Sequence, residues 1–288
     1  MMDARIEGFF DPQTHTVSYV LADPATGRCA IIDPVWDYDA ASGRTATGTV
    51  ERIARHVEEH DLRVELILET HAHADHLSAS QFLKRRFQAP LAIGAHIVEV
   101  QRVFRRVFHI DGDEIDQYAF DRLLQDGEAF TVGDLELRAM HTPGHTPACM
   151  AYVGDGYAFV GDTLFMPDYG TARTDFPGGD ARTLYRSIQR LYALPEETRL
   201  YLCHDYLPDA GRDEFRWVTT VAEERRHNIH VRDGIDEDAF VRMREARDAG
   251  LALPKLLVPS VQVNIRGGHL PAPESNGVPY LKVPIDQL

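Results

Sequence analysis

The sequence is poor in cysteine and has no long apolar run, and both features exclude whole classes of protein. Its three cysteines, Cys29, Cys149 and Cys203, lie far apart without a paired spacing, so neither a disulfide framework nor a thiolate zinc cage is expected. No stretch approaches the length of about 18 apolar residues that a membrane span needs, and the first residues lack the apolar core of a signal peptide. We therefore expect a cytoplasmic protein that contacts no membrane.

Basic residues are scarce relative to acidic ones. The chain has 30 Lys and Arg residues against 45 Asp and Glu residues, which gives a formal net charge of -15. Nucleic acids and anionic membranes are bound largely through Lys and Arg side chains that neutralise phosphate, so neither is expected as a partner. The rest of the composition, with 44% hydrophobic and 26% charged residues, is typical of a globular protein with a large core.

The order of predicted elements indicates two packed sheets. Turn residues at 23–27 separate strands at 16–21 and 29–32, and a helix at 49–60 then leads into a buried strand at 64–69. Periodicity further predicts helices at 77–87, 95–108 and 181–194, hairpins at 130–138 and 150–160, a strand at 199–202 and two helices after residue 213. Strands followed by a helix occur twice, which is typical of two sheets packed face to face with helices outside.

Residues 70–76, with the sequence THAHADH, place three imidazoles and a carboxylate directly after a predicted buried strand. A single histidine usually only packs or forms a hydrogen bond, but His71, His73, Asp75 and His76 share one loop at the carboxyl end of a strand, where open α/β sheets bind ligands. His71 and His73 can turn toward one ion, and Asp75 and His76 toward a second position. The loop therefore favours a metal site.

Three more strand ends carry a polar side chain of the same kind, namely His141, Asp162 and His204. A divalent metal needs imidazoles and carboxylates that converge from several segments, and Asp162 could bridge two positions. His145 follows a Thr-Pro-Gly turn that would carry it away from His141, so we expect it to act behind the ligands. Asp33, at the end of an early strand, suits the same role, although capping of a turn before a proline explains it equally well.

These residues resemble the signature of the metallo-β-lactamase superfamily, a His-x-His-x-Asp-His loop followed by a His, an Asp and a His at successive strand ends. The resemblance covers roughly residues 14–206 and implies an α/β fold, an αββα sandwich of two mixed sheets with outer helices. We expect a single domain over residues 1–288, in which 207–288 form a C-terminal helical extension and tail. The acidic segment 109–123 is expected to be a solvated insertion.

Within the superfamily, the chain is similar to the glutathione-linked branch, because Asp162 stands where the zinc β-lactamases have a cysteine. The segment GTARTDFPGGD, residues 170–180, resembles the bacterial persulfide dioxygenases. The resemblance implies oxidation of glutathione persulfide by O2 to sulfite and glutathione. The alternative is a glyoxalase II-like zinc hydrolase of acylglutathione thioesters, because the same ligands hold two metals in those enzymes.

The resemblance also implies the roles of individual residues. One non-haem Fe(II) per chain would be held by His71, His141 and Asp162, with zinc as the metal of the alternative. A second metal position or the cavity wall would be formed by His73, Asp75, His76 and His204. Arg173 would hold a glutathione carboxylate and Tyr206 would face the substrate sulfur, with Asp33 and His145 behind the ligands. A homodimer is left open.

Overall fold

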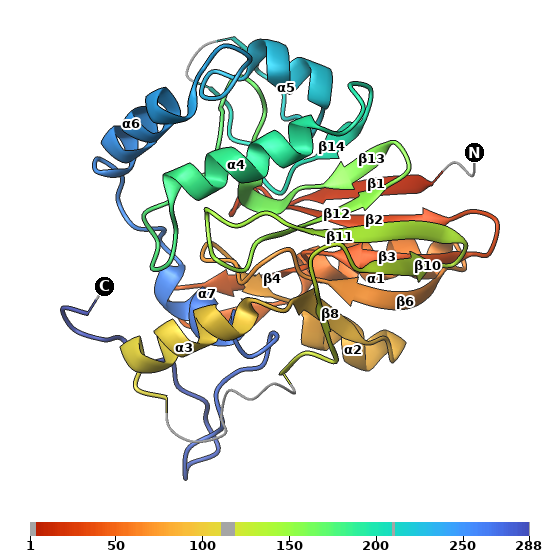
Figure 1. Ribbon diagram of the computed structural model, residues 1–288. Coiled ribbons are helices and arrows are strands. Elements are labelled where there is room, and N and C mark those ends of the chain that lie inside the picture. The colour runs from red at the N-terminus through yellow and green to blue at the C-terminus, as the bar shows by residue number, and fades with distance from the viewer. Residues whose placement is uncertain (1–3, 111–118, 209–210, 288) are drawn as a thin grey trace.

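The computed structural model describes residues 4–110, 119–208 and 211–287, and it shows two sheets packed face to face with helices on both outer faces (Figure 1). This arrangement confirms the predicted αββα sandwich. Residues 111–118 of the acidic insertion expected at 109–123 lie outside the described residues. Its last residues are not a solvated loop, because Phe120 is buried and Arg122 begins strand β9.

The first sheet has the strand order β1-β2-β3-β6-β8-β9. Its strands are β1 (Arg5–Phe10), β2 (Val17–Asp23), β3 (Arg28–Ile32), β6 (Arg63–Leu68), β8 (Leu91–Gly94) and β9 (Arg122–Leu124). The first three strands pair antiparallel, and the rest pair parallel. The sheet is therefore mixed, as expected.

The second sheet has the order β10-β11-β12-β13-β14-β15 and is also mixed. Its strands are β10 (Ala129–Val132), β11 (Leu135–His141), β12 (Met150–Gly154), β13 (Tyr157–Phe159), β14 (Arg199–Tyr201) and β15 (Val218–Thr220). A small third sheet joins β5 (Arg44–Ala46), β4 (Val35–Asp39) and β7 (Leu77–Ser78).

Helices cover the outer face of each large sheet (Figure 1). The helices are α1 (Gly48–Glu59), α2 (Ser80–Phe87), α3 (Ile97–Val107), α4 (Ala181–Tyr192), α5 (Val221–His227), α6 (Glu237–Asp248) and α7 (Leu257–Asn264). Apolar residues of α1, α2, α3 and α7 share one core with the first sheet. Those of α4, α5 and α6 share another with the second sheet.

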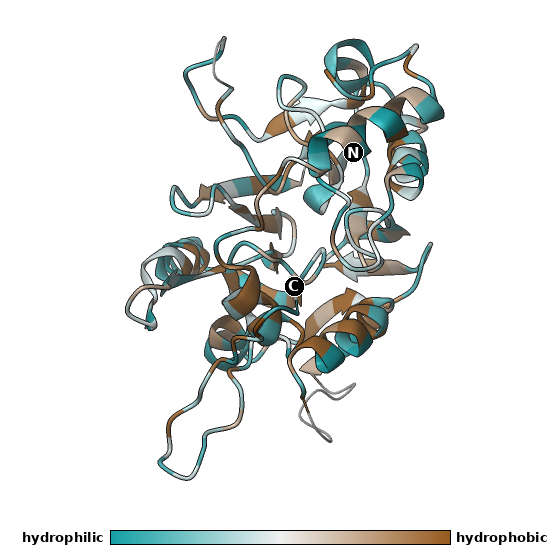
Figure 2. Ribbon diagram, turned by 90° about the vertical axis from the view of Figure 1, so that its left-hand side faces the viewer, coloured by the Kyte–Doolittle hydropathy of each residue, from teal (hydrophilic) through white to brown (hydrophobic). Residues whose placement is uncertain are grey.

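Strand β2 shows how the sequence builds these layers, because all seven of its residues are buried. Successive side chains of a strand point to opposite faces. Val17, Tyr19 and Leu21 accordingly enter the core between the two sheets, whereas Val20 and Ala22 face the helices. Figure 2 shows the same distribution, with hydrophobic residues concentrated in the strands and on the inward sides of the helices.

Two parallel strand pairs determine where polar loops gather. Strand β3 runs parallel to β6, and β13 runs parallel to β14, so the loops that follow the two members of each pair leave from the same edge of their sheet. Polar ligand sites of α/β sheets lie at such carboxyl ends. An isolated bridge between Thr16 and His204 links the first sheet to the chain after β14, which brings the two edges together.

The C-terminal region differs from the expectation of two helices, because three occur there, α5, α6 and α7. Helix α7 has the sequence LVPSVQVN, with Pro259 at its third position and little sign of amphipathic periodicity. Proline is tolerated in the first turn, where no intrahelical donor is needed. Burial of Leu257, Val261 and Ile265 in the core of the first sheet stabilises the helix instead.

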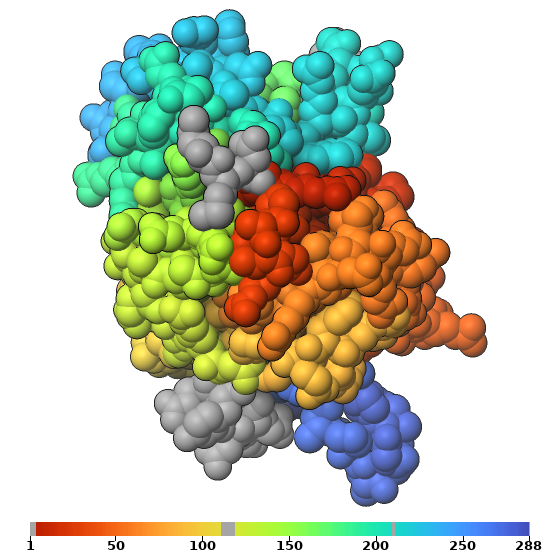
Figure 3. Space-filling model, turned by 90° about the vertical axis from the view of Figure 1, so that its right-hand side faces the viewer, coloured from red at the N-terminus to blue at the C-terminus, as the bar shows by residue number. Residues whose placement is uncertain are grey.

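The last residues of the chain lie on the surface. Figure 3 shows part of the chain after α7 projecting below the body, and Val283 and Ile285 are 69% and 74% exposed. Among the described residues, no helix combines the length and apolar character required to span a bilayer.

Helix α5 buries a carboxyl group. The helix begins with a capping box between Thr220 and Glu223, and the next residue, Glu224, is fully buried. One oxygen of Glu224 accepts a hydrogen bond from Asn228 Nδ2 at 2.7 Å, and the other has no partner among the described residues. Burial raises the pKa of Glu224 to about 8, since a buried carboxylate loses its hydration.

This pKa predicts a pH-dependent stability. A carboxyl whose pKa is raised in the folded state stabilises the fold most below its unfolded pKa of about 4.3, and this contribution is lost as the pH rises through about 8. We expect Glu224→Gln to remove that loss. From pH 5 to 8, the free energy of unfolding of the variant should therefore rise relative to that of the wild type by up to about 1.4 kcal/mol per pH unit. Denaturant unfolding at each pH measures it. The exposed Glu223→Gln is the control, and parallel pH profiles for wild type and Glu224→Gln would contradict the prediction.

Candidate metal centre

The histidine loop lies between β6 and β7 and is held almost entirely inside the protein. His71, His73 and His76 are each at most 1% exposed. The loop itself contains no helix or strand, so each side chain takes its direction from specific hydrogen bonds. Those bonds determine which ring nitrogen of each histidine points into the site.

Asp33, which follows β3, is the partner behind this loop. Its carboxylate accepts hydrogen bonds from Thr70 N at 2.7 Å, from Thr70 Oγ1 at 2.9 Å and from His73 Nε2 at 3.0 Å. Burial raises the pKa of Asp33, but the charge of His73 and these hydrogen bonds outweigh burial and lower it overall. The structure therefore places an ionised Asp33 against His73.

The direction of His71 follows from Thr70. Because the Thr70 hydroxyl gives its only proton to Asp33, it accepts at 3.0 Å from Nδ1–H of His71. The lone pair of His71 then lies on Nε2, which is buried without a hydrogen-bond partner among the described residues and faces Asp162 Oδ2 at 3.9 Å.

His145 and His204 are oriented in the same way by backbone carbonyl groups. A carbonyl oxygen only accepts, so Nδ1–H of His145 donates to Arg173 O at 2.8 Å and Nδ1–H of His204 donates to His15 O at 3.2 Å. The Nε2 atoms face Asp162, at 3.7 Å from His145 and 3.4 Å from His204.

His73 and His76 complete the set. His73 donates from Nε2 to Asp33, so Nδ1 is the ring nitrogen that faces the site. Burial alone would lower the pKa of His73, but the Asp33 carboxylate outweighs it and raises that pKa well above its usual value, so a metal ion bound at Nδ1 would displace a proton. His76 donates from Nδ1 to the Asp75 carboxylate at 3.1 Å, which leaves its lone pair on Nε2. Nδ1 of His73 and Nε2 of His76 are both buried without a hydrogen-bond partner in the described parts of the chain. Five imidazoles therefore direct a ring nitrogen toward one region.

The spacing of these atoms fits a metal ion. Ligand atoms of His71, His145 and Asp162 lie within 4.8 Å of one another, and so do those of His73, Asp75 and His76. His204 Nε2 lies 3.5 Å from Asp75 Oδ2, and Asp162 Oδ1 is also buried without a hydrogen-bond partner among the described residues. Buried acceptors that face each other without donors are destabilising unless a cation binds between them. The donor set therefore fits one divalent ion, with a second position beside it.

Charge supports the same interpretation. Burial, with His73 and His145 adding to it, lowers the pKa of His71 well below its usual value, so its imidazole is neutral and can coordinate. Burial alone would raise the pKa of Asp75, but the neighbouring imidazoles of His204 and His76 outweigh it and hold that pKa well below the usual range. Asp75 is therefore ionised in the folded protein.

His141 lies apart from this cluster, which corrects the sequence-based placement of His141 and His145. His141 Nε2 donates to Pro147 O at 2.8 Å, and its ring stacks on His96 with centroids 4.1 Å apart. The turn after β11 does carry His145 away from His141, as expected, but it carries His145 into the cluster. Gly144, at φ 139°, allows this turn, because a Cβ there would lie 2.4 Å from the Leu184 backbone.

Glu69 is a site residue that the sequence analysis missed. It is 3% exposed, and its Oε2 lies 3.4 Å from His73 Nε2 beside Asp33. Its Oε1 accepts from the hydroxyl groups of Ser78 and Ser80. A charged residue at the end of the apolar run VELIL was the available signal.

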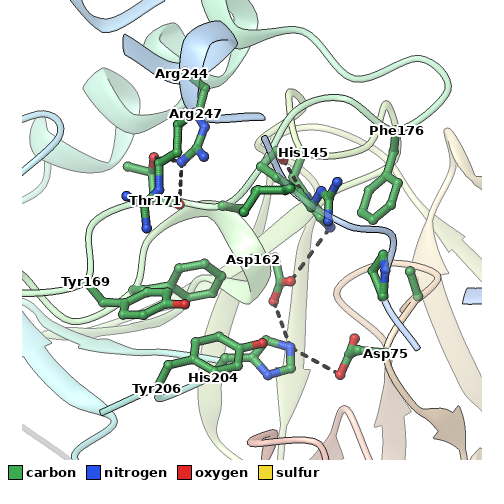
Figure 4. Close-up of a pocket in the computed structure, with 16 residues that line it drawn as sticks. Asp75, His145, Asp162, Tyr169, Thr171, Phe176, His204, Tyr206, Arg244 and Arg247 are labelled. Carbon is green, nitrogen blue, oxygen red and sulfur yellow. Dashed lines mark hydrogen bonds and ion pairs between the residues drawn. The ribbon is translucent and has the colours of Figure 1, made fainter. Parts of the chain in front are cut away.

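A cavity of about 290 Å³ opens onto the cluster (Figure 4). It runs from the polar side chains of the site to a wall built by α6 and the chain after it. It is lined by Ala74, Asp75, His145, Asp162, Phe165, Tyr169, Thr171, Ala172, Arg173, Phe176, His204, Tyr206, Arg244, Arg247, Leu251 and Pro254. A small organic molecule can therefore reach Asp162 and His204.

Aromatic rings form one side of the cavity. Tyr206 stacks on Tyr169 with centroids 4.9 Å apart and on His204 at 5.5 Å (Figure 4). Burial raises the pKa of Tyr206 well above its usual value, so its phenol stays protonated and can donate a hydrogen bond.

Three arginines form the opposite side, and they differ in how far they are already engaged. Arg173 donates to both carboxylate oxygens of Asp175 at 2.6 Å and to Ala252 O at 2.7 Å. Arg244 is buried and pairs with Asp248 at 2.7 Å. Arg247 is exposed, and its guanidinium group has neither a hydrogen-bond nor an ion-pair partner in the described ranges. Arg247, which the sequence analysis missed, is therefore the cation best able to bind an anionic ligand.

Comparison with known proteins supports the metal centre and gives conflicting indications of its chemistry. A Burkholderia pseudomallei protein named "Probable metallo-hydrolase" is 54% identical over 98% of this chain and 99% of its own length. "Glyoxylase B2" of Dictyostelium discoideum is 44% identical over 99% of this chain and 98% of its own. The bovine mitochondrial persulfide dioxygenase ETHE1 is 30% identical over 90% of this chain and 87% of its own.

Other relatives, 51% identical over 99% of this chain, are longer proteins of which this chain spans 65%. Among solved structures, ETHE1 from Myxococcus xanthus has a TM-score of 0.74 at 32% identity and covers 92% of this chain and 100% of its own. Residues 12–204 match the metallo-beta-lactamase superfamily as a family. The match contains strands β2 to β14 and every cluster residue from Asp33 to His204, so this chain belongs to the metallo-beta-lactamase superfamily.

Proposed function

We propose that this protein is a glutathione-dependent persulfide dioxygenase with one non-haem Fe(II) per chain. It would convert glutathione persulfide, O2 and water to glutathione and sulfite. The terminal sulfur is oxidised, O2 is reduced, and water supplies the remaining oxygen atom of sulfite. The observation that carries the proposal is the cluster of His71, His145 and Asp162 at the inner end of a cavity that has a cationic wall.

Two histidines and one carboxylate are the ligand set of non-haem Fe(II) oxygenases, which leaves coordination positions open for O2 and substrate. In this proposal the iron ligands are His71, His145 and Asp162. When bound there, Fe(II) supplies the redox chemistry that allows O2 to react with the persulfide. The similarity to persulfide dioxygenase ETHE1 proteins supports this choice of metal.

The protein's own residues orient and shield the reaction. Hydrogen bonds from Nδ1 fix the rings of His71 and His145, so that neither can rotate away from the ion. Tyr206 holds a protonated hydroxyl beside the site, where it can donate to the substrate sulfur. Phe165 and Tyr169 present apolar surface around that sulfur and limit the access of water.

The substrate carboxylates would meet the arginine wall. Glutathione carries two carboxylates, and a guanidinium group binds a carboxylate through two parallel hydrogen bonds. Arg173 already holds Asp175 in this way and also holds the loop at Ala252, so it binds substrate only through its remaining donors. We assign the first carboxylate contact to Arg247 and keep Arg173 as a second contact.

One observation favours a second candidate, a glyoxalase II-like zinc hydrolase of acylglutathione thioesters. His73, Asp75, His76 and His204 form a second donor set beside the first, and a two-metal hydrolase requires two such sets. The names of the Burkholderia and Dictyostelium relatives agree with this alternative. In the dioxygenase proposal, these four residues line the cavity beside a single iron.

The metal decides between the two candidates. Zinc has no accessible redox change and cannot activate O2. We expect the Fe(II) form to consume O2 with glutathione persulfide and to form sulfite, whereas the zinc form does neither. Oxygen uptake and sulfite assay measure this, with hydrolysis of S-lactoylglutathione as the parallel assay. Rapid thioester hydrolysis by the zinc form, without persulfide-dependent oxygen uptake by the iron form, would establish the hydrolase instead.

The assignment of His145, rather than His141, as an iron ligand can be tested directly. We expect His145→Ala to lose most of its iron, because it removes one of three ligands, whereas His141→Ala keeps about one iron per chain. Elemental analysis of protein purified without oxygen measures the iron, and thermal unfolding checks that both variants fold. Iron loss in His141→Ala with full retention in His145→Ala would restore the original assignment.

Arg247 should act in substrate binding rather than in chemistry. Removing one charge-assisted contact costs about 1.5 to 3 kcal/mol, so Arg247→Ala should raise KM for glutathione persulfide roughly tenfold or more and leave kcat nearly unchanged. Arg242→Ala is the matched control, because Arg242 is exposed on the same helix and does not line this cavity. Equal KM values for the two variants would exclude the contact.

A further inference from the structure

We propose that Asn264, at the end of α7, is a positioning residue that fixes the backbone of the histidine loop. The inference rests on the proposed metal centre, but not on which reaction that centre catalyses. Asn264 lies 191 residues from His73 in the sequence, beyond the segment that matches the superfamily. Its role is visible only in the folded protein.

The Asn264 side chain joins three points of the loop. Its Nδ2 donates to His73 O at 2.8 Å and to His76 O at 2.8 Å, and its Oδ1 accepts from Ser78 N at 2.8 Å. Both amide hydrogens are used, and the residue is 4% exposed. One amide group therefore holds the chain at three points between His73 and Ser78, the last residue of β7.

The loop needs such a partner because it cannot pair its own backbone. Residues 71–76 belong to no helix or strand, and buried carbonyl groups without a donor are strongly unfavourable. The two carbonyl groups that Asn264 satisfies belong to His73 and His76, the two residues whose site-facing ring nitrogens form one side of the cluster. Rotation of either peptide would turn the attached imidazole, so Asn264 acts on the direction of both rings.

Helix α7 is rigid enough for this task. Leu257, Val261 and Ile265 are buried in the core of the first sheet. Gln101 of α3 donates to Ile265 O at 2.9 Å, and Gln81 of α2 donates to Gly267 O at 2.8 Å. The end of α7 that carries Asn264 is therefore fixed relative to α2 and α3, so the Asn264 amide has a defined position against the histidine loop.

The same helix offers a matched control in Gln262. This residue is 1% exposed, and its Nε2 donates to Val258 O at 2.8 Å and to Lys282 O at 2.9 Å, while its Oε1 accepts from Lys282 N at 2.9 Å. Gln262 thus has the same bonding pattern as Asn264, but it binds the C-terminal tail instead of the histidine loop.

The test compares Asn264→Asp with Gln262→Glu. Each change replaces two donor hydrogens by a carboxylate oxygen that faces two carbonyl groups, so both should lower the stability of the metal-free protein. Only Asn264→Asp should also weaken metal binding, by about tenfold or more, as loss of partners behind metal ligands usually does. Competition with a chelator measures the dissociation constants for Zn²⁺ and Co²⁺. The absorption spectrum of the Co²⁺ form should change in Asn264→Asp and match the wild type in Gln262→Glu.

Asn264→Gln is the second variant, to be used if Asn264→Asp does not fold. It retains the amide but displaces it by one methylene, so it should weaken Zn²⁺ and Co²⁺ binding in the same direction and by less. The proposal would be overturned if the folded Asn264 variants had the same metal dissociation constants and Co²⁺ spectra as the wild type. It would also be overturned if Gln262→Glu lost as much metal affinity as Asn264→Asp. A wild-type protein that binds metal but takes up no O2 would refute the dioxygenase proposal and leave this inference standing.

Discussion

The site depends on the buried carboxylate of Asp33. It accepts from the backbone and hydroxyl of Thr70 and from Nε2 of His73, so it joins the end of β3 to the loop after β6. By taking the Thr70 proton it also determines that His71 presents Nε2, and by accepting from His73 it determines that His73 presents Nδ1. One ionised group thus sets the tautomers of two neighbouring histidines. Asp33 has a left-handed backbone with φ 49°, a strained conformation that the surrounding hydrogen bonds maintain.

The two halves of the sandwich contribute in complementary ways. The first sheet supplies the histidine loop with Asp33 behind it, and the second supplies His145, Asp162 and His204 at or after its strand ends. Each half concentrates acceptors that repel those of the other half, so the edge where the sheets meet is unfavourable without a cation. Metal binding and closure of the sandwich are therefore coupled in this fold.

Much of this arrangement could be predicted, because strand ends are visible in the sequence. The parallel pairs β3 with β6 and β13 with β14 explain why loops far apart in the chain share one edge. The choice between His141 and His145 could not be made in the same way. Both histidines flank one turn, and which of them enters the cluster depends on how Gly144 packs against Leu184, a contact across 40 residues.

Arg247 and Asn264 escaped prediction for a related reason. A free cation on an exposed helix face and a polar residue in a short apolar helix have no distinctive local pattern, and their roles arise from what lies opposite them after folding. Both follow the segment that matches the superfamily. Donors at the strand ends define a metal centre that one fold can offer to many reactions. Helix α6 and the chain after it build the far wall of the cavity, and α7 donates hydrogen bonds to the histidine loop, so in our proposals substrate binding and the geometry of the metal centre both depend on the C-terminal part of the chain.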